Sequence, residues 1–270
     1  MQIRSILVHL DPGLASVTRL TLAHGLAERF DAEITVLFGS GVAATPPAFA
    51  YSASAALHAA EESEDRNDLA RTRLQAVHGE RPGSWCEARG DLAQALIAEA
   101  AYSDLLILGA PTSANDAGSA PLGLVEAAIL RGGTPTLVVP HPHYQQTLGQ
   151  RVLIAWDGSI PAARAVRAAL PFLRRAEQVD VVSWSAAPVL APFSRLALGE
   201  WLKRHDVDSR MHQHGHAARL GDVLRTKAQE LASDLIVMGC YGHARLRERV
   251  FGGATRSVLT SLPVPVLMAH

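Results

Sequence analysis

Short apolar runs recur along the chain, and between them lie longer segments in which apolar residues return at helical spacing. Runs of this kind are typical of strands that are buried on both faces of a parallel sheet. The intervening segments are long enough for the helices that connect parallel strands. The hydrophobic pattern therefore predicts an α/β fold. The strongest runs are Ile6–Leu10, Ala32–Phe38, Leu105–Leu108, Val152–Trp156 and Leu235–Met238.

Helical patterns fill much of the sequence between these runs. Leu20–Phe30 places its apolar residues on one helix face. Asp11 is placed to cap this first helix, and Asp91 stands near the start of the short helix Asp91–Ala101. Strand, helix and strand units of this kind build parallel sheets with right-handed connections. We also expect helices at Ala53–Val77 and Leu122–Arg131, and strands at Gly83–Ala88 and Thr134–Pro140.

The second half of the chain repeats the landmarks of the first. Asp157 follows a strand as Asp11 does, at an offset of 146 residues, and Asp234 opens a strand as Asp104 does, at an offset of 130. The terminal strand Val264–Met268 repeats Thr134–Val138, again at an offset of 130. Three landmarks in one order indicate an internal duplication.

The duplication predicts two domains, at residues 1–141 and 150–270, joined by the polar, proline-bearing linker His141–Gln150. Each copy has the order β-α-β-α-β-α-β-α-β. We therefore expect two tandem open parallel five-stranded sheets with helices on both faces. In such sheets, ligands bind at the carboxyl ends of the strands, where the winding direction reverses.

Composition narrows the function classes. The formal net charge of −1 over 270 residues gives no global signal for nucleic-acid binding, and no apolar run approaches the length that crosses a bilayer. Two cysteines, Cys86 and Cys240, are too few for a disulfide framework. The apolar stretch around Ile6 is too short for a signal peptide. We expect a soluble cytoplasmic protein with no nucleic-acid or membrane partner.

The stretch Asp234–Ser257 carries the strongest chemical signal. Its strand ends at Gly239, and glycines follow at positions 242, 252 and 253. Glycines at a strand end let backbone amides approach a ligand, and a helix that starts after Gly253 would direct free N–H groups at an anion such as phosphate. Arginines at positions 245, 247 and 249 either pair with phosphate oxygens or form a solvated face.

These motifs resemble the universal stress protein family in its tandem form. The resemblance rests on Asp157-Gly158-Ser159, on the Asp234–Gly239 strand, on the glycines and on the terminal Pro-Val-Leu strand, and it covers almost the whole chain. It implies an adenine nucleotide α-hydrolase-like, Rossmann-like fold. The ATP-binding branch of the family carries G-x2-G-x9-G-(S/T), and Gly239, Gly242 and Gly252 fall on its three glycines.

The resemblance implies binding of ATP, alone or with Mg²⁺, in the second copy. Asp157 would lie near the adenine or ribose, Ala155 would touch the base, and the loop Gly239–His243 would line the phosphates. Gly253 departs from the motif, because Ser or Thr is expected there. Backbone amides of residues 252–254 would still hold an anion, and the missing hydroxyl would come from Thr255 or Ser257. The predicted nucleotide-binding residues are Ala155, Asp157, Gly239, Gly242, His243, Gly252, Gly253, Ala254 and Thr255.

The first copy lacks most of this motif. Thr112 stands where the second glycine is expected, Leu124 follows Gly123, and Pro12 replaces the glycine after the strand-end aspartate. We expect a strand-to-helix loop without a ligand in this copy.

Three other features allow two interpretations each. The histidines at positions 212, 214 and 216 would share one face of a strand, where they either bind zinc or copper or form an ordinary exposed edge, and we predict no metal site. Cys240 is either a redox-sensitive thiol or a small residue in a tight loop. Trp156 and Trp184 either stack on a base or pack in the core.

Catalytic motifs are not evident: there is no His and carboxylate pair at catalytic spacing, no G-x-S-x-G elbow and no Walker A lysine. We predict no catalytic residues, and at most slow ATP hydrolysis. The first hypothesis is a stress-response module that binds or senses ATP through its second domain. The alternative is a ligand-free interaction scaffold with vestigial sites, and the weakest is a hydrolase or transferase of the adenine nucleotide α-hydrolase type.

The resemblance also implies an assembly. The two copies would pair through their last strands, Thr134–Val139 and Val264–Met268, so that one chain mimics a family dimer. A further homodimer of the whole chain is compatible with this arrangement.

Overall fold

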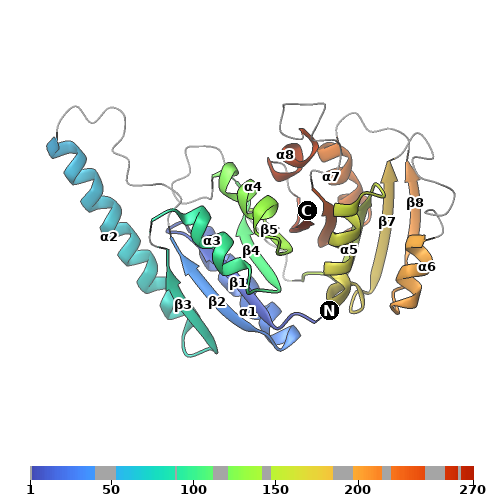
Figure 1. Cartoon of the computed structure of the whole chain (residues 1–270), viewed down its shortest axis with the longest axis horizontal. Coiled ribbons are helices and arrows are strands. Elements are labelled where there is room, and N and C mark those ends of the chain that lie inside the picture. Colours follow the sequence, from blue (N-terminus) through green and yellow to red (C-terminus); the bar gives the residue numbers. More distant parts are fainter. Residues whose placement is uncertain are drawn as a thin grey trace. The chain divides into compact units, whose positions relative to one another are not determined.

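The computed structural model describes residues 2–39, 53–88, 90–111, 121–141, 147–184, 197–214, 220–240, 253–260 and 263–270 (Figure 1). The chain divides into two compact units. The first unit is Arg4–Gly132, and the second unit is Gly133–His270 together with Met1–Ile3.

The first unit is built around four parallel strands in the order β3-β2-β1-β4. The chain runs outward from β1 to β2 and β3 and then returns to β4 on the other side of β1 (Figure 1). The elements are β1 (Ser5–Leu10), α1 (Ala15–Phe30), β2 (Glu33–Phe38), α2 (Ala53–His78), β3 (Gly83–Glu87), α3 (Leu92–Ala100), β4 (Leu105–Gly109) and α4 (Leu122–Arg131).

The second unit repeats this order with β6 at its centre. Its strands follow the order β5-β10-β9-β6-β7-β8, and all neighbours are parallel except β5 and β10. The elements are β5 (Thr136–Val139), β6 (Arg151–Trp156), α5 (Ile160–Leu173), β7 (Gln178–Trp184), α6 (Ala197–Arg204), β8 (Arg210–His214), α7 (Leu220–Glu230), β9 (Leu235–Gly239), α8 (Gly253–Thr260) and β10 (Val266–Ala269).

Helices cover both faces of the sheet, which explains why the central strands are apolar, whereas the outer strands β3 and β8 carry polar residues. In the first unit α1 packs with α2 and α3 packs with α4, and in the second unit α7 packs with α8. Leu7 and Val8 on β1 are fully buried, as are Ile154 on β6 and Val237 on β9. Both faces of a central strand must therefore be apolar. The predicted α/β fold, with parallel strands and helices on both sides, is confirmed.

In each unit, an aspartate at the start of one strand accepts hydrogen bonds from the backbone at the start of the central strand beside it. The Asp104 carboxylate accepts hydrogen bonds from the backbone N–H groups of Arg4 and Ser5 at 2.9 and 3.0 Å. The Asp234 carboxylate accepts three such bonds, from the N–H groups of residues 149, 150 and 151 at 2.9, 3.0 and 3.0 Å. These aspartates are the pair that the sequence repeat aligned, so the duplication extends to backbone contacts.

The last strand of the first copy, β5, belongs to the second compact unit because it pairs with β10. The antiparallel register aligns Val138 with Val266 and Leu137 with Leu267. The compact units therefore divide the chain at residue 132, whereas the sequence repeat divides it within the linker. The domain limits of 1–141 and 150–270 describe the repeat and stay a prediction.

The start of the first helix differs from the prediction. Helix α1 begins at Ala15, before the expected Leu20, and its N-cap residue Leu14 makes no side-chain cap. Asp11 does not cap this helix, because its carboxylate accepts bonds from Arg19 and from the N–H of Gly13. The cap predicted at Asp91 is confirmed, since its Oδ1 accepts the N–H groups of residues 93 and 94 at 2.9 and 3.4 Å.

Among the described residues, no helix combines the length and the apolar composition that crossing a bilayer requires.

Candidate functional site

The end of β6 presents an exposed aspartate at the point where the winding direction of the second unit reverses. Asp157 follows β6 and is exposed, while its Oδ1 accepts the N–H of Ser159 at 2.9 Å. Gly158 between them has a φ of +76°, a conformation that suits glycine. Ser159 then caps α5, because its Oγ accepts the N–H of Ala162 at 3.2 Å. The turn therefore places Asp157 beside the N-terminus of α5.

The neighbouring strand β9 ends in contact with the same helix. A Cβ atom added to Gly239 would lie 2.3 Å from the backbone nitrogen of Ala162 and 2.7 Å from the carbonyl carbon of Pro161. Only glycine fits at such a distance. The register of β6 and β9 pairs Ala155 with Met238, so Ala155, Asp157 and Gly239 lie at one edge of the sheet. The N-terminus of α5 lies at this end of the strands and carries the positive end of the helix dipole, and its first turn contains no acidic residue that would offset this charge.

The other predicted nucleotide-binding residues are only partly covered by the structure. Gly242, His243 and Gly252 lie outside the described residues. Gly253, Ala254 and Thr255 form the first turn of α8, which begins at Gly253, one residue before the expected start.

The two hydroxyls expected to replace the missing Ser or Thr lie in the packed part of α8. Thr255 is buried, at 4% exposure. Ser257 contacts α7 so closely that a Cβ added to Gly221 would lie 2.5 Å from the Ser257 Oγ. Thr255 is therefore buried within the fold, and Ser257 lies in the contact between α7 and α8.

Cys240 is a packed residue, not a reactive thiol. Its side chain is 1% exposed, and its Sγ donates to the carbonyl oxygen of Ala269 at 3.1 Å. Burial raises the pKa of the Cys240 thiol to about 12. Because the thiolate is the reactive form, the interpretation as a tight-loop residue is favoured over the redox interpretation.

The histidine-rich segment is described only at its start. His212 lies on β8 at the edge of the sheet, and its Nε2 is 2.7 Å from Oδ1 of the buried Asp180. The side chains of His214 and His216 lie outside the described residues. Within the part of the chain that the structure describes, no three metal-binding side chains come together.

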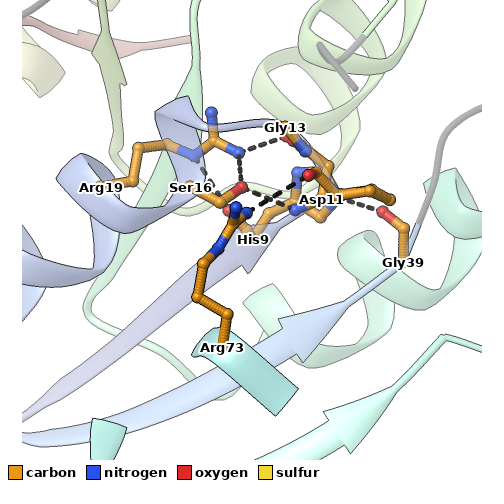
Figure 2. Close-up of polar contacts among 8 residues, drawn as sticks. His9, Asp11, Gly13, Ser16, Arg19, Gly39 and Arg73 are labelled. Carbon is orange, nitrogen blue, oxygen red and sulfur yellow. Dashed lines mark hydrogen bonds and ion pairs between the residues drawn. The ribbon is translucent and has the colours of Figure 1, made fainter. Parts of the chain in front are cut away.

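In the first unit, a buried ion pair occupies the corresponding position at the carboxyl end of β1 (Figure 2). The guanidinium Nη2 of Arg19 donates to Oδ2 of Asp11 and, at 2.8 Å, to the Oγ of Ser16. The Arg19 Nε donates to the carbonyl oxygen of His9 at 3.2 Å. The N–H of Asp11 donates to the Ser16 Oγ at 2.9 Å, and the other Asp11 oxygen accepts the N–H of Gly13 at 2.8 Å. The carboxylate at this strand end is thus bound by the protein itself.

Arg19 also covers the end of the adjacent strand. A Cβ added to Gly109 would lie 2.2 Å from the Arg19 Nη1. At the repeat offset of 146 residues, the second copy has Ala165 in place of Arg19. In the second unit Gly239 therefore meets the backbone of α5, whereas in the first unit a guanidinium lies between the strand end and the helix.

His9 fills the position that corresponds to Ala155. Its imidazole is fully buried, and its Nε2 donates to the carbonyl oxygen of Gly39 at 2.9 Å. Burial, followed in size by the positive charge of Arg19, lowers the pKa of His9 to about 4. The ring is therefore neutral near pH 7. The sequence analysis did not identify His9 and Arg19. The repeat could have indicated them, because at the offset of 146 residues each aligns with an alanine of the second copy.

The chain matches known proteins at two levels. Residues 149–270 match the family model described as the Universal stress protein family. A universal stress protein from Archaeoglobus fulgidus DSM 4304 has a TM-score of 0.71 at 18% identity, over 100% of this chain and 99% of that one. A protein of unknown function from Pseudomonas aeruginosa PAO1 has a TM-score of 0.63 at 19% identity, over 99% of this chain and 92% of that one.

At these identities the two structures establish a common fold over the full length of the chain. A search of curated protein sequences finds no match.

Proposed function

Because residues 149–270 belong to the universal stress protein family, we propose that the second unit binds ATP, alone or with Mg²⁺, and that the protein acts as a tandem universal stress protein. The bound nucleotide would be sensed or held in a stress response. The proposed ligand is an adenine nucleotide, and the proposed place of action is the cytoplasm. Two cysteines are too few for a disulfide framework, which favours a reducing compartment.

The observation that carries this proposal is the exposed carboxylate of Asp157 at the sheet edge where β6 and β9 end. A carboxylate in this position can accept hydrogen bonds from ribose hydroxyls. Gly239 brings the end of β9 against the N-terminus of α5, and α8 begins at Gly253. Free N–H groups at helix N-termini are suited to phosphate. Ala155, a small and partly exposed residue near the end of β6, would contact the base.

The phosphate-binding part of the proposal rests on sequence spacing. Gly242, His243 and Gly252 follow Gly239 at the intervals of the family motif, and the backbone of residues 252–254 would hold phosphate oxygens. Thr255 is buried, so we assign the phosphate contacts mainly to backbone amides and not to its hydroxyl.

A second role is supported for the first unit. The ion pair between Arg19 and Asp11 and the imidazole of His9 fill the edge at which a nucleotide would bind. We therefore propose that the first unit is a ligand-free scaffold. The antiparallel pairing of β5 with β10 supports an arrangement in which the two copies form an intramolecular pseudo-dimer. A homodimer of the chain is a further prediction.

A matched pair of variants tests the assignment of the site. Gly242→Val places a side chain in the proposed phosphate loop and should abolish ATP binding, measured by equilibrium dialysis. Thr112→Val alters the aligned position of the first copy and should leave ATP affinity unchanged. Equal effects of the two substitutions would mean that the site is assigned to the wrong copy. Absence of ATP binding to the unmodified chain at millimolar concentration would leave the scaffold role for both units.

A further inference from the structure

A small pocket lies on the side of α5 that faces α6 in the second unit. Its volume is about 170 Å³, and it reaches from the end of β6 to the exposed surface of α5. Its lining consists of Trp156, Ala163, Val166, Arg167, Leu198 and Trp201. None of these residues belongs to the proposed nucleotide site.

The pocket and the residue assigned to the base lie on opposite sides of β6 near its end. Successive side chains of a strand point to opposite faces. Trp156 lines the pocket, so the preceding Ala155, assigned to the base, points to the other face. Ala155 therefore lies outside the pocket, although both sites adjoin β6 and α5.

The walls of the pocket are held by packing around them. The Trp201 ring contacts the His205 ring, with centroids 4.2 Å apart. His205 is in turn held by Arg174 at the end of α5, whose Nε donates to the His205 carbonyl oxygen at 3.0 Å. Val166 and Leu198 form a buried floor, at 2% and 6% exposure. The indole of Trp201 therefore has a fixed place, and a ligand would enter a preformed space.

The size of the pocket selects a ligand with a single ring. A dry cavity of about 150 Å³ accommodates a benzene molecule, so this open pocket of about 170 Å³ holds one six-membered ring, and a small substituent can extend from it toward solvent. Two indole rings in the lining favour a flat aromatic partner, because offset and edge-to-face ring contacts add to the gain from apolar burial.

The positive charge of Arg167 in the lining favours a ligand that carries a carboxylate. Arg167 is the one charged residue in the lining, and its side chain is exposed. Among the residues that the structure describes, no carboxylate forms an ion pair with Arg167. Its guanidinium is thus available to a carboxylate that extends from the ring.

We propose that this pocket binds a small aromatic carboxylate of the size of benzoate, with the ring between Trp156 and Trp201 and the carboxylate at Arg167. The inference does not depend on nucleotide binding, because the two sites use different residues. The first unit lacks the required groups: Leu10 and Thr21 stand at the offset of 146 residues from Trp156 and Arg167. One ligand per chain is therefore expected.

Benzoate is a suitable probe, because two of the four tryptophans line the pocket and report on it by fluorescence. Titration of the full chain should give a saturable change in tryptophan fluorescence at millimolar or lower benzoate, with one site per chain by calorimetry. Benzyl alcohol, which has the ring without the charge, should bind more weakly. A response that does not saturate by about 10 mM benzoate, which corresponds to less than about 3 kcal/mol of binding free energy, would overturn the proposal.

Two variants identify the site. Arg167→Gln lies on an exposed helix face and should weaken benzoate about fivefold, the size of effect of an exposed ion pair, while benzyl alcohol is unaffected. Ala163→Leu should fill the pocket and abolish binding of both compounds, with thermal unfolding checked alongside. Lys203→Gln removes an exposed cation on α6 that does not line the pocket, and it should change neither affinity. If Arg167→Gln and Lys203→Gln had equal effects, the assignment of the carboxylate to Arg167 would be wrong.

Discussion

The guanidinium of Arg19 and the carboxylate of Asp11 form an ion pair inside the first unit, with side chains that are only 3% and 2% exposed (Figure 2). A buried pair of this kind contributes little net stability over an apolar pair, yet removal of one partner leaves an uncompensated charge. The folded state of the first unit therefore requires both partners of this ion pair. The ion pair lies at the end of β1. At the corresponding end of β6 in the second unit, Ala165 replaces Arg19, and Asp157, which corresponds to Asp11, is exposed.

Arg19→Ala should destabilise the first unit by roughly 3–5 kcal/mol, because Asp11 would remain buried without its partner. Urea unfolding followed by circular dichroism measures this loss as a lower urea concentration at the midpoint. Arg4→Ala is the matched control, since it removes an exposed ion pair with Asp31, of 55% and 89% side-chain exposure, that is worth at most about 1 kcal/mol. Equal losses in the two variants would contradict the buried pairing of Arg19.

Acid should destabilise the protein through histidines that are buried in the neutral form. The Nε2 of His24 on α1 lies 3.1 Å from the Nδ1 of His78 on α2. Burial, followed by the charges of Arg81 and His78, lowers the pKa of His24 to about 4, and burial followed by the charge of Arg81 also lowers the pKa of His78. Between pH 6.5 and about 4 the unfolded state therefore binds more protons than the folded state, so stability falls as the pH falls.

His24 should add a slope of at most about 1.4 kcal/mol per pH unit within this window, and His78 and His9 contribute in the same direction. His24→Leu should reduce the pH dependence of the unfolding free energy between pH 6.5 and 4.5. His141→Gln, a substitution at an exposed histidine, should leave that dependence unchanged. An undiminished slope in His24→Leu would show that the pair does not act as described.

Two glycines, one packed against a helix and one with open space around it, should respond oppositely to substitution by alanine. Gly239→Ala would place its Cβ against the backbone of α5 and should cost about 1–3 kcal/mol through overpacking. Gly25 is exposed within α1 and has no atom within 4 Å of an added Cβ, so Gly25→Ala should stabilise the protein by about 0.5–1 kcal/mol. Thermal unfolding of both variants measures the contrast, and a neutral Gly239→Ala would contradict the close approach of β9 and α5.

The strands were predictable because their pattern follows from burial alone. Leu105–Gly109 and Leu235–Gly239 lie under helices on both faces, so their sequences contain an apolar run and little else. The helix Leu122–Arg131 and the cap at Asp91 were also predicted, since periodicity and local hydrogen bonding are set by neighbouring residues. The repeat then fixed the order of the elements in the second half.

The buried contacts at the end of β1 could not be predicted in the same way. An arginine on a helix is ordinarily exposed, so Arg19 interrupted the apolar pattern and moved the predicted start of the helix to Leu20. Its burial depends on Asp11, eight residues earlier, and on the backbone of β1 and the glycine at the end of β4. Such a contact arises only when strand ends and helix are assembled. The pocket between α5 and α6 depends in the same way on residues 45 positions apart, Trp156 and Trp201.

The most direct test of this account is calorimetric titration of the purified chain with ATP in the presence of Mg²⁺, compared with Asp157→Ala. We predict saturable binding of one ATP per chain. Arg19 and His9 occupy the end of β1 in the first unit, whereas the second unit has an exposed Asp157 at the end of β6. Asp157→Ala should weaken binding roughly tenfold or more, as expected for loss of hydrogen bonds to a charged group. Absence of binding at millimolar ATP, or binding of two nucleotides per chain, would contradict the account.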